Sequence, residues 1–390
     1  MAKLTAKQRQ WLMTLLAQPT APFREQIVIE TVVAELTRAG VPMFEDPIGN
    51  IVVGVASQKE YARLLRTKSD EPVRLFIAHM DHPGFHGVEW LGPRRLSIKW
   101  HGGSPVRHLN GARVWLANSR GVVADGTLAR VKLLPNKRAL DTAEVQVSVW
   151  RDGAILEEAS ALFGGLGFRA PVWQQGQKIY TKAADDLVGV FCIVALAQTL
   201  FAKKSAQIPF LGLLTRAEEV GFIGAIGHFD LGWVHNARRP VMAVSLEASR
   251  TLPNAMVGKG PVVRLGDRRT VFNADGLRML TDLAEKILPG KHQRRIMDGG
   301  ACEGSAATAY GIPTIALSVP LGNYHNQGFE GGPDCAFAEG PAPEFVHLDD
   351  IAGQLALCKG IMREGLSWQE PWAPTRRALR KNFRHYQDLL

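Results

Sequence analysis

The chain has 390 residues and a formal net charge of +9 at pH 7, with 46% hydrophobic and 21% charged residues. This composition is ordinary for a soluble globular protein, and the length predicts one large domain with an insertion, or two domains. No apolar run reaches the roughly 18–20 residues that cross a bilayer, so no membrane partner is expected. The four cysteines lack CxxC spacing, which argues against a zinc knuckle or a disulfide framework and fits a reducing, cytoplasmic location.

The first segments are predicted to be helical and to lead into a buried strand. Basic residues precede the short apolar stretch Trp11–Ala17, which is also the layout of a signal peptide, but no small-residue cleavage site follows. An amphipathic helix is therefore favoured there. Residues 23–39 repeat apolar side chains at helical spacing, and Gly40 follows as a typical C-cap. After an extended piece at 50–55, the apolar run 73–78 leads directly to His79.

The character of the sequence changes from about Trp90 to Trp173. Helical periodicity is absent there, and short β-like runs at 112–117, 126–134 and 144–149 are separated by Gly, Asn and Pro turn signals. We expect residues 88–176 to form a small β-domain inserted into a larger, discontinuous domain made of residues 1–87 and 177–390.

Strands and helices alternate again after the insertion. Strand-like runs are predicted at 208–214, 241–246 and 314–319, and helices at 187–200, 276–288 and 349–362. This alternation predicts the α/β class, with a central mixed, mostly parallel sheet covered by helices on both faces. Ligands of such sheets bind beyond the carboxyl ends of the strands.

Acidic and histidine motifs follow these strands in a fixed order, and four of the five lie at predicted strand ends. One imidazole and a few carboxylates on each ion, with one carboxylate shared, suit Zn²⁺ or Co²⁺, and two such ions about 3.5–4 Å apart form a hydrolytic centre. The motifs are His79-Met80-Asp81, Asp185-Asp186, Glu218-Glu219, Glu247 and His325.

Each motif also has a plainer interpretation. Asp185-Asp186 could cap the helix that follows, and Glu218-Glu219 could be a solvated acidic pair. Because Glu218-Glu219 follows a predicted strand, we expect extended backbone there, on which the two side chains diverge, so that one can bind metal while the other faces the attacking water. Asp81 is placed to orient the imidazole of His79, since a metal-bound histidine needs an acceptor at its other ring nitrogen.

In this order and spacing the chain resembles the dinuclear-metal aminopeptidases of the tetrahedral (TET) and glutamyl-aminopeptidase family. The insertion between His79 and Asp185 spans 185 − 79 = 106 residues. The gap from Glu247 to His325, where related carboxypeptidases and deacylases carry an extra domain, is only 325 − 247 = 78. The motifs that carry the resemblance are Asp46–Ile51, His79–Asp81, Lys182–Asp186, Thr215–Gly221 and Gly311–Thr314.

The resemblance implies a role for each residue. His79 and Glu247 would bind one metal, Glu219 and His325 the other, and Asp185 would bridge them. A cis peptide bond would precede Asp186. The ions would be Zn²⁺ first, with Co²⁺ or Mn²⁺ compatible.

Two sites depart from the family pattern. Glu247 stands where the family has aspartate. Gly299–Glu303 stands where it has Gly-Gly-Thr-Asp, which bears on substrate preference.

The implied activity is that of a cytoplasmic metallo-aminopeptidase acting on short peptides, a hydrolase in which Glu218 is the general base. One alternative is a dinuclear-metal deacylase or carboxypeptidase acting on N-acyl amino acids or peptides, for which Arg250 and Arg264 are candidate carboxylate-binding residues. A non-catalytic binding or scaffold protein is a further alternative. The family builds particles of twelve chains, so a homo-oligomer, and a dodecamer in particular, is expected, with the insertion serving oligomerisation or substrate gating.

The positive charge is not predicted to bind nucleic acid, because the basic residues are scattered along the chain. Their densest group lies in the C-terminal tail and is predicted to be a solvated helix face, with an oligomer or polyanion contact as the alternative. It consists of Arg376, Arg377, Arg380, Lys381 and Arg384.

Overall fold

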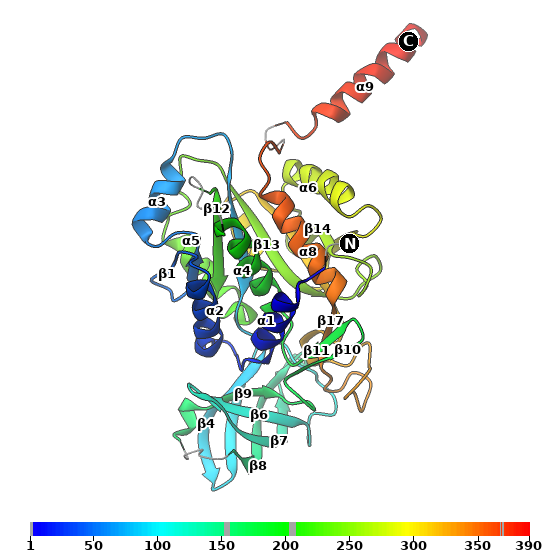
Figure 1. The fold of residues 1–390 in the computed structure, drawn as a ribbon. Coiled ribbons are helices and arrows are strands. Elements are labelled where there is room, and N and C mark those ends of the chain that lie inside the picture. The colour runs from blue at the N-terminus through cyan, green and yellow to red at the C-terminus, as the bar shows by residue number, and fades with distance from the viewer. Residues whose placement is uncertain (1–2, 152–156, 203–207, 367, 369) are drawn as a thin grey trace.

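The chain forms a layered α/β body, a closed β-barrel at one end of that body, and a helix that projects from the other end (Figure 1). The structure is a computed structural model, and it describes residues 3–151, 157–202, 208–366, 368 and 370–390. Among these residues, no helix is both long enough and apolar enough to cross a membrane.

The body is built on an eight-stranded mixed sheet. Its middle strands β12, β3, β13 and β16 are parallel. Strand β2 runs antiparallel to both of its neighbours, whereas β14 runs antiparallel to β16 and parallel to β15. The strands in spatial order are β1 (Met43–Glu45), β2 (Ile51–Val53), β12 (Phe210–Thr215), β3 (Val73–His79), β13 (Val241–Arg250), β16 (Thr314–Leu321), β14 (Val262–Asp267) and β15 (Gln293–Met297).

Helices cover both faces of this sheet because its central strands are apolar on both sides. In β3, Phe76 and Ala78 point into one core, whereas Val73, Leu75 and Ile77 point into the other. The first core is closed by α1 (Ala6–Ala17), α2 (Gln26–Arg38), α4 (Leu187–Phe201), α6 (Ala274–Ile287) and α8 (Leu348–Ile361). The second is closed by α3 (Gln58–Arg66), α5 (Ile223–Asp230) and α7 (Glu303–Ala309).

The inserted segment forms a six-stranded antiparallel barrel with its own apolar core. The barrel runs from Gly84 to Leu166, while residues 172–175 pair in a separate three-stranded sheet that belongs to the body. The barrel strands in spatial order are β4 (Gly84–Gly92), β5 (Arg95–His101), β8 (Leu140–Trp150), β7 (Gly121–Leu133), β6 (Arg113–Asn118) and β9 (Phe163–Leu166). The small sheet contains β10 (Val172–Gln175), β11 (Lys178–Thr181) and β17 (Glu344–His347).

The α/β class, the mostly parallel sheet and the separate β-domain are therefore confirmed. Two local predictions are wrong. Glu247 does not end its strand, since β13 continues to Arg250. Glu218 and Glu219 are not on extended backbone but in a 3₁₀ turn, Glu218–Val220, which follows Ala217 in the left-handed region at φ 53°.

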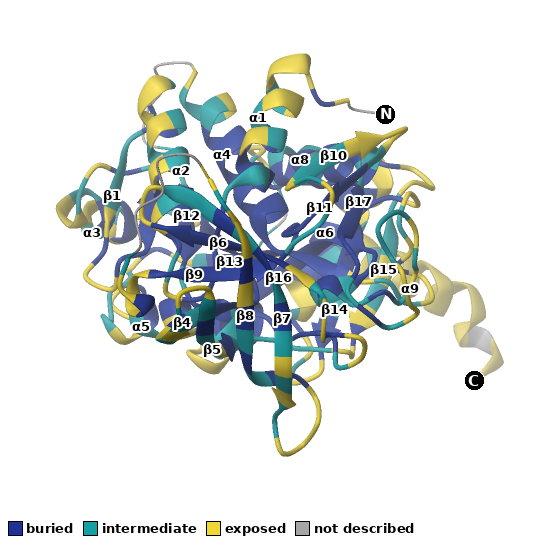
Figure 2. Cartoon of the chain, turned by 90° about the horizontal axis from the view of Figure 1, so that it is seen from below, coloured by how far each residue is buried: buried dark blue, intermediate teal, exposed yellow. Residues whose placement is uncertain are grey.

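Helix α9 (Ala373–Tyr386) lies apart from these layers. None of its residues is buried, and it extends away from the body on the side opposite the barrel (Figure 1). In Figure 2 buried residues fill the centre of the molecule, whereas α9 stands out as an exposed arm.

Candidate metal centre

The structure brings the five predicted ligands together at the rim where the parallel strands end. His79 is the last residue of β3, and Glu247 lies near the end of β13. Glu219 follows β12, Asp185 directly precedes the cap of α4, and His325 lies in a short turn after β16. Because parallel strands end on one edge of a sheet, residues separated by more than 200 positions in sequence converge there.

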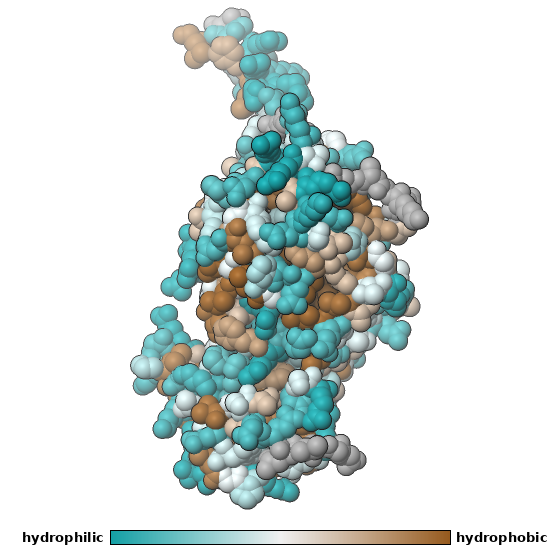
Figure 3. Space-filling model, turned by 90° about the vertical axis from the view of Figure 1, so that its left-hand side faces the viewer, coloured by the Kyte–Doolittle hydropathy of each residue, from teal (hydrophilic) through white to brown (hydrophobic). Residues whose placement is uncertain are grey.

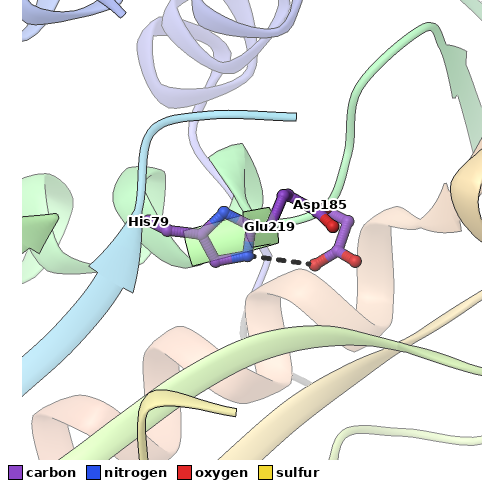
Figure 4. Close-up of side chains that lie close together, drawn as sticks. All are labelled: His79, Asp185 and Glu219. Carbon is purple, nitrogen blue, oxygen red and sulfur yellow. Dashed lines mark ion pairs between the residues drawn. The ribbon is translucent and has the colours of Figure 1, made fainter. Parts of the chain in front are cut away.

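Asp185 lies between the two histidines. Its Oδ1 is 3.6 Å from Nε2 of His79, and its Oδ2 is 3.7 Å from Nε2 of His325. Nε2 of His325 is also 3.2 Å from Oε2 of Glu219. Figure 4 shows the imidazole of His79 and the carboxylate of Asp185 facing each other, with Glu219 beside them. Each oxygen of Asp185 thus faces a different imidazole.

Glu218 and Glu247 complete the cluster on the side of His79. One ligand atom each from His79, Glu218 and Glu247 lies within 4.8 Å of the others, and the same holds for His79, Asp185 and Glu219. Oε2 of Glu218 is 3.8 Å from Nε2 of His79. The Glu218 carboxylate is therefore close enough either to face a reacting water or to bind the ion itself.

These donor atoms fit divalent metal ions. Two donors bound at about 2.0–2.2 Å to one tetrahedral ion lie roughly 3.3–3.6 Å apart, and the closest pairs here are separated by 3.2–3.8 Å. Four of the donors are buried and have no hydrogen-bond partner among the described residues, which is costly unless a cation balances them. They are Oδ1 of Asp185, Oε1 of Glu219, Oε1 of Glu247 and Nε2 of His325.

The electrostatics of the cluster indicate the same need for positive charge. Burial, reinforced by Asp185, raises the pKa of Glu247 to about 8 although Arg264 opposes the shift. Burial also raises the pKa of Glu218 well above its usual range, helped by Glu247. The pKa of His325 rises to about 9, because Glu219 and Asp185 outweigh the effect of burial. Without a metal ion, the cluster would therefore retain protons.

Asp81 positions the two glutamates. Its Oδ1 accepts a hydrogen bond from the backbone N–H of Glu218 at 2.9 Å, and its Oδ2 accepts one from that of Glu219 at 3.1 Å. Nδ1 of His79 lies closer to the carbonyl oxygen of Asp81, at 3.1 Å, than to its carboxylate, at 3.5 Å. Asp81 therefore contacts both the histidine and the turn that carries the glutamates.

Glu344, on β17, is a site residue that the sequence motifs did not reveal. Its Oε2 accepts hydrogen bonds from the backbone N–H groups of Ala184 and Asp185, at 2.7 and 3.2 Å. Its Oε1 accepts one from the N–H of His325, at 2.9 Å. Glu344 is fully buried, and it ties together two ligand loops that are distant in sequence. Only the backbone N–H groups that it contacts in the folded protein distinguish Glu344 from other glutamates.

Further contacts fix the loop around Asp185. Nδ1 of His82 lies 2.8 Å from the carbonyl oxygen of Asp185, so His82 contacts the backbone of the loop that carries Asp185. The side chain of Asp186 accepts a hydrogen bond from the N–H of Gly189 at 3.1 Å and caps α4. The Asp185–Asp186 peptide bond is cis, as the resemblance implied. The acidic pair is thus divided between a helix cap, Asp186, and the candidate metal centre, Asp185.

The barrel forms one wall of the site. Gly103, in the loop after β5, lies so close to His325 that an added Cβ would stand 2.0 Å from its Nδ1. A cavity of about 200 Å³ opens beside Glu247 and His325, between this loop and the body. Other residues that line it include Ser104, Arg138, Arg250, Arg264, Gly299, Gly300 and Phe329.

Arginine side chains give this cavity a positive wall. Arg264 is buried; its Nη1 donates to Oγ of Ser249 at 3.2 Å and lies 3.9 Å from Oε2 of Glu247. Its Nε has no hydrogen-bond partner among the described residues. Arg250 lies over the ring of Phe329, at 3.9 Å from the ring centre. The cavity can therefore receive a polar or anionic group close to Glu247.

Comparison with known proteins agrees with this geometry. The model of the M42 glutamyl aminopeptidase family matches residues 62–328, which is more than half of the chain. No curated protein sequence matches the chain.

Among solved structures, the Pyrococcus horikoshii TET1 peptidase, described as assembling into a tetrahedron or a large octahedral shell, is 21% identical. The match covers 92% of this chain and 99% of that one, with a TM-score of 0.67. Aminopeptidase APDkam598 from the archaeon Desulfurococcus kamchatkensis is 19% identical, with coverages of 93% and 97% and a TM-score of 0.70. At these identities the structures show a shared fold.

Replacing Glu344 with glutamine should weaken metal binding about 10–100-fold, the usual effect of losing a residue that orients ligands. The glutamine amide has only one acceptor oxygen, so it would turn an NH₂ group toward the N–H of His325 or toward those of Ala184 and Asp185. Competition with a chelator measures the affinity. The control is Glu339→Gln, which removes a surface carboxylate paired with Arg107 at 3.2 Å. Equal affinities in the two variants would contradict a positioning role for Glu344.

The stability of the metal-free protein should fall as pH rises from about 4.5 to 8. The pKa values of Glu247 and Glu344 are raised to about 8 from 4.5, so the folded state holds extra protons in that window, and deprotonation favours unfolding. His325 acts in the same direction, since its pKa is raised to about 9 and its favourable charge is lost as pH rises through that value.

Metal ions bind the deprotonated ligands, so the stabilisation they provide should grow over the same window. Thermal melts at a series of pH values, with chelator or with Zn²⁺, measure the difference in Tm. A difference that stays constant or narrows with rising pH would contradict the assignment of these carboxylates to a metal centre.

Proposed function

Because this chain belongs to the M42 glutamyl aminopeptidase family, we propose that it removes the N-terminal residue of short peptides at a centre of two divalent metal ions. Membership of this family makes the chain a metal-dependent aminopeptidase, which is a hydrolase. The position of Asp185 carries the proposal of two ions, since its oxygens face His79 and His325 separately, at 3.6 and 3.7 Å.

The proposed ligands form two sets that share Asp185. His79 and Glu247 would hold one ion, and Glu219 and His325 the other. The short distance between Glu219 and His325, 3.2 Å, supports the second set, and the grouping of His79 with Glu247 supports the first. A mixture of imidazole and carboxylate donors suits Zn²⁺ best, and it also accepts Co²⁺ or Mn²⁺.

Two bound ions would polarise the scissile carbonyl group and lower the pKa of the attacking water. Glu218 is the proposed general base: it would take a proton from that water and return it to the leaving amine. Burial raises the pKa of its carboxyl group well above the usual range, which is the direction that makes the carboxylate a stronger proton acceptor.

Asp81 is proposed as a positioning residue. It holds the N–H groups of Glu218 and Glu219 and also contacts His79, so it fixes the proposed base relative to both ligand sets. Since proton transfer requires an approach of about 2.6–3.2 Å, a displaced turn would impair the base before it disturbed the rest of the fold.

A second candidate function is removal of an acyl group, or of a C-terminal residue, from N-acyl amino acids or peptides. The observation that favours it is the positive wall of the cavity, where Arg264 is buried, its Nε has no hydrogen-bond partner in the described part of the chain, and Arg250 is a second lining arginine. A guanidinium group there could pair with a substrate carboxylate. The same wall would also suit a peptide with an acidic side chain.

We also propose that the protein is a cytoplasmic homo-oligomer, and a dodecamer in particular. A similar structure is described as a PhTET1 dodecamer; it is 21% identical, covers 91% of this chain, and has a TM-score of 0.67. The four cysteines are free, as expected in a reducing compartment. In a hollow particle, access would restrict substrates to short or unfolded peptides.

Glu218→Gln should lower kcat by about 10²–10⁴-fold while leaving the metal content unchanged, because it removes a proton acceptor but keeps the side-chain shape. Hydrolysis of aminoacyl chromogenic substrates with added Zn²⁺ or Co²⁺ measures the rate. Glu219→Gln is the matched variant one residue away, and it should lose metal affinity as well. If Glu218→Gln instead loses one metal ion per chain, Glu218 is a ligand and not the base.

A peptide with a free N-terminal amine should be cleaved faster than its N-acetylated form if the aminopeptidase proposal holds. Both forms are compared at equal metal loading by the appearance of the released amino acid. Faster cleavage of the acetylated peptide would support the second candidate function instead.

Excising the barrel should dissociate the proposed assembly while leaving the metal ligands in place. Phe85 and Gly164 are paired on adjacent strands, so a short linker can join the chain where it enters and leaves the barrel. Light scattering gives the particle mass, and metal analysis shows whether the body still folds. If the excised variant keeps its full mass, the barrel serves substrate gating and not assembly, in keeping with the contact between Gly103 and His325.

A further inference from the structure

Helix α9 is held to the body mainly at its first turn. The indole Nε1 of Trp372 donates a hydrogen bond to Oδ1 of Asp275 at 2.8 Å, and the guanidinium group of Arg278 lies 5.6 Å from the centre of the Trp372 ring. Beyond this anchor, no residue of α9 is buried. The helix therefore presents its whole circumference to its surroundings (Figure 1).

The two sides of α9 differ sharply in chemistry. Leu379, Phe383 and Tyr386 are spaced four and three residues apart, so they lie on one side of the helix, where they are 65%, 57% and 53% exposed. Figure 3 shows hydrophobic atoms gathered on one side of the projecting helix and hydrophilic atoms on the other. The opposite side carries Arg377, Arg380, Lys381 and Arg384.

Most basic side chains of α9 have no carboxylate partner among the residues that the structure describes. Among the described residues, only Arg376 has a carboxylate within 4.0 Å, that of Glu370 at 3.9 Å. No acidic residue occurs between Ala373 and Tyr386. Among the described residues, Arg377, Arg380, Lys381 and Arg384 therefore have no carboxylate partner, and the helix carries concentrated positive charge.

Charge distinguishes between the possible binding partners of this helix. Two copies of α9 packed through their apolar sides would combine five basic residues from each helix in one pair with no acidic residue from either, so like-charge repulsion opposes that pairing. A nucleic acid would attract the arginines but would gain nothing from the apolar side. An anionic bilayer surface matches both sides at once, since its phosphates attract the basic residues and its acyl boundary accepts the apolar ones.

We propose that α9 docks this protein on the surface of bilayers that contain anionic phospholipids. Leu379, Phe383 and Tyr386 enter the boundary between head groups and acyl chains, and the arginines and Lys381 contact lipid phosphates. The sequence analysis expected no membrane partner because no apolar run is long enough to cross a bilayer; docking on a surface requires no such run, and the proposal departs from that expectation. Each basic residue near such a surface contributes attraction that is screened by salt.

The test is flotation of the full-length protein with vesicles of phosphatidylcholine alone, or of phosphatidylcholine mixed with phosphatidylglycerol. The protein should float with the mixed vesicles and not with phosphatidylcholine alone, and added salt should release it. Leu379→Ser combined with Phe383→Ser should lower the partition coefficient on the order of tenfold or more, because each side chain loses its burial in the boundary. Arg380→Gln combined with Lys381→Gln and Arg384→Gln should also weaken binding, and should reduce its dependence on salt.

Matched controls lie elsewhere on the surface. Val271→Ser removes an apolar side chain that is 67% exposed, similar to Leu379, and Arg63→Gln combined with Arg66→Gln removes charge from the exposed side of α3. These variants should float like the unchanged protein, and every variant should keep its peptidase activity.

Three results of the flotation assay would overturn the proposal. They are no flotation with either vesicle, equal flotation with both, or equal losses in the α9 variants and the controls. If the α9 variants change the particle mass in light scattering without any loss of vesicle binding, the helix is an assembly arm and the proposal is wrong.

Discussion

The interaction on which this molecule depends is the mutual repulsion of carboxylates buried at the end of the central sheet. Asp185, Glu218, Glu219 and Glu247 lie within a few ångströms of two imidazoles, and Glu303 and Glu344 are buried close behind them. Burial and repulsion together raise the pKa of Glu303 to about 7 and that of Glu344 to about 8. Such a cluster is stable only with bound cations or retained protons. Because cations and protons compete for the same carboxylates, metal binding is linked to both stability and activity.

The rest of the site holds these repelling groups in place. Three buried carboxylates that are not proposed ligands accept hydrogen bonds from the backbone of the ligand loops: Asp81 from the Glu218 turn, Glu344 from the loops of Asp185 and His325, and Glu25 from Ala217 at 3.0 Å. Ala217 and His325 have positive φ angles of 53°, which cost of order 1–3 kcal/mol each for residues with a side chain. The hydrogen bonds offset this cost, so the ligands are fixed before any ion binds.

Much of the site was predictable from sequence because its residues directly follow strands. An apolar run that ends in His79, or that leads into Glu218 and Glu219, can be recognised in the sequence as a strand followed by candidate ligands. Parallel strands then bring such strand ends together. The sequence around Glu344 does not mark it as a site residue. Glu344 lies on a short strand of a separate antiparallel sheet, and its role depends on three N–H groups distant in sequence. The 3₁₀ turn at Glu218 was missed for a related reason, because Glu25 and Asp81, far away in the chain, hold it. The tail was correctly expected to be an exposed basic helix, yet its apolar side went unnoticed.

The order of the strands also has a consequence during synthesis. All seven residues of β3 are buried, and its neighbours in the sheet are β12 and β13. β12 begins at Phe210, which is 210 − 79 = 131 residues after β3 ends. At about 5–20 residues per second, the ribosome needs roughly 7–26 s to supply the first partner. During that interval the barrel can close around its own core, since its strands are contiguous in sequence. The buried strand β3 has no neighbouring strand to pair with until β12 is synthesised. The nascent chain is therefore most prone to aggregate before its proposed metal ligands have met, and a chaperone that covers β3 would act at that stage.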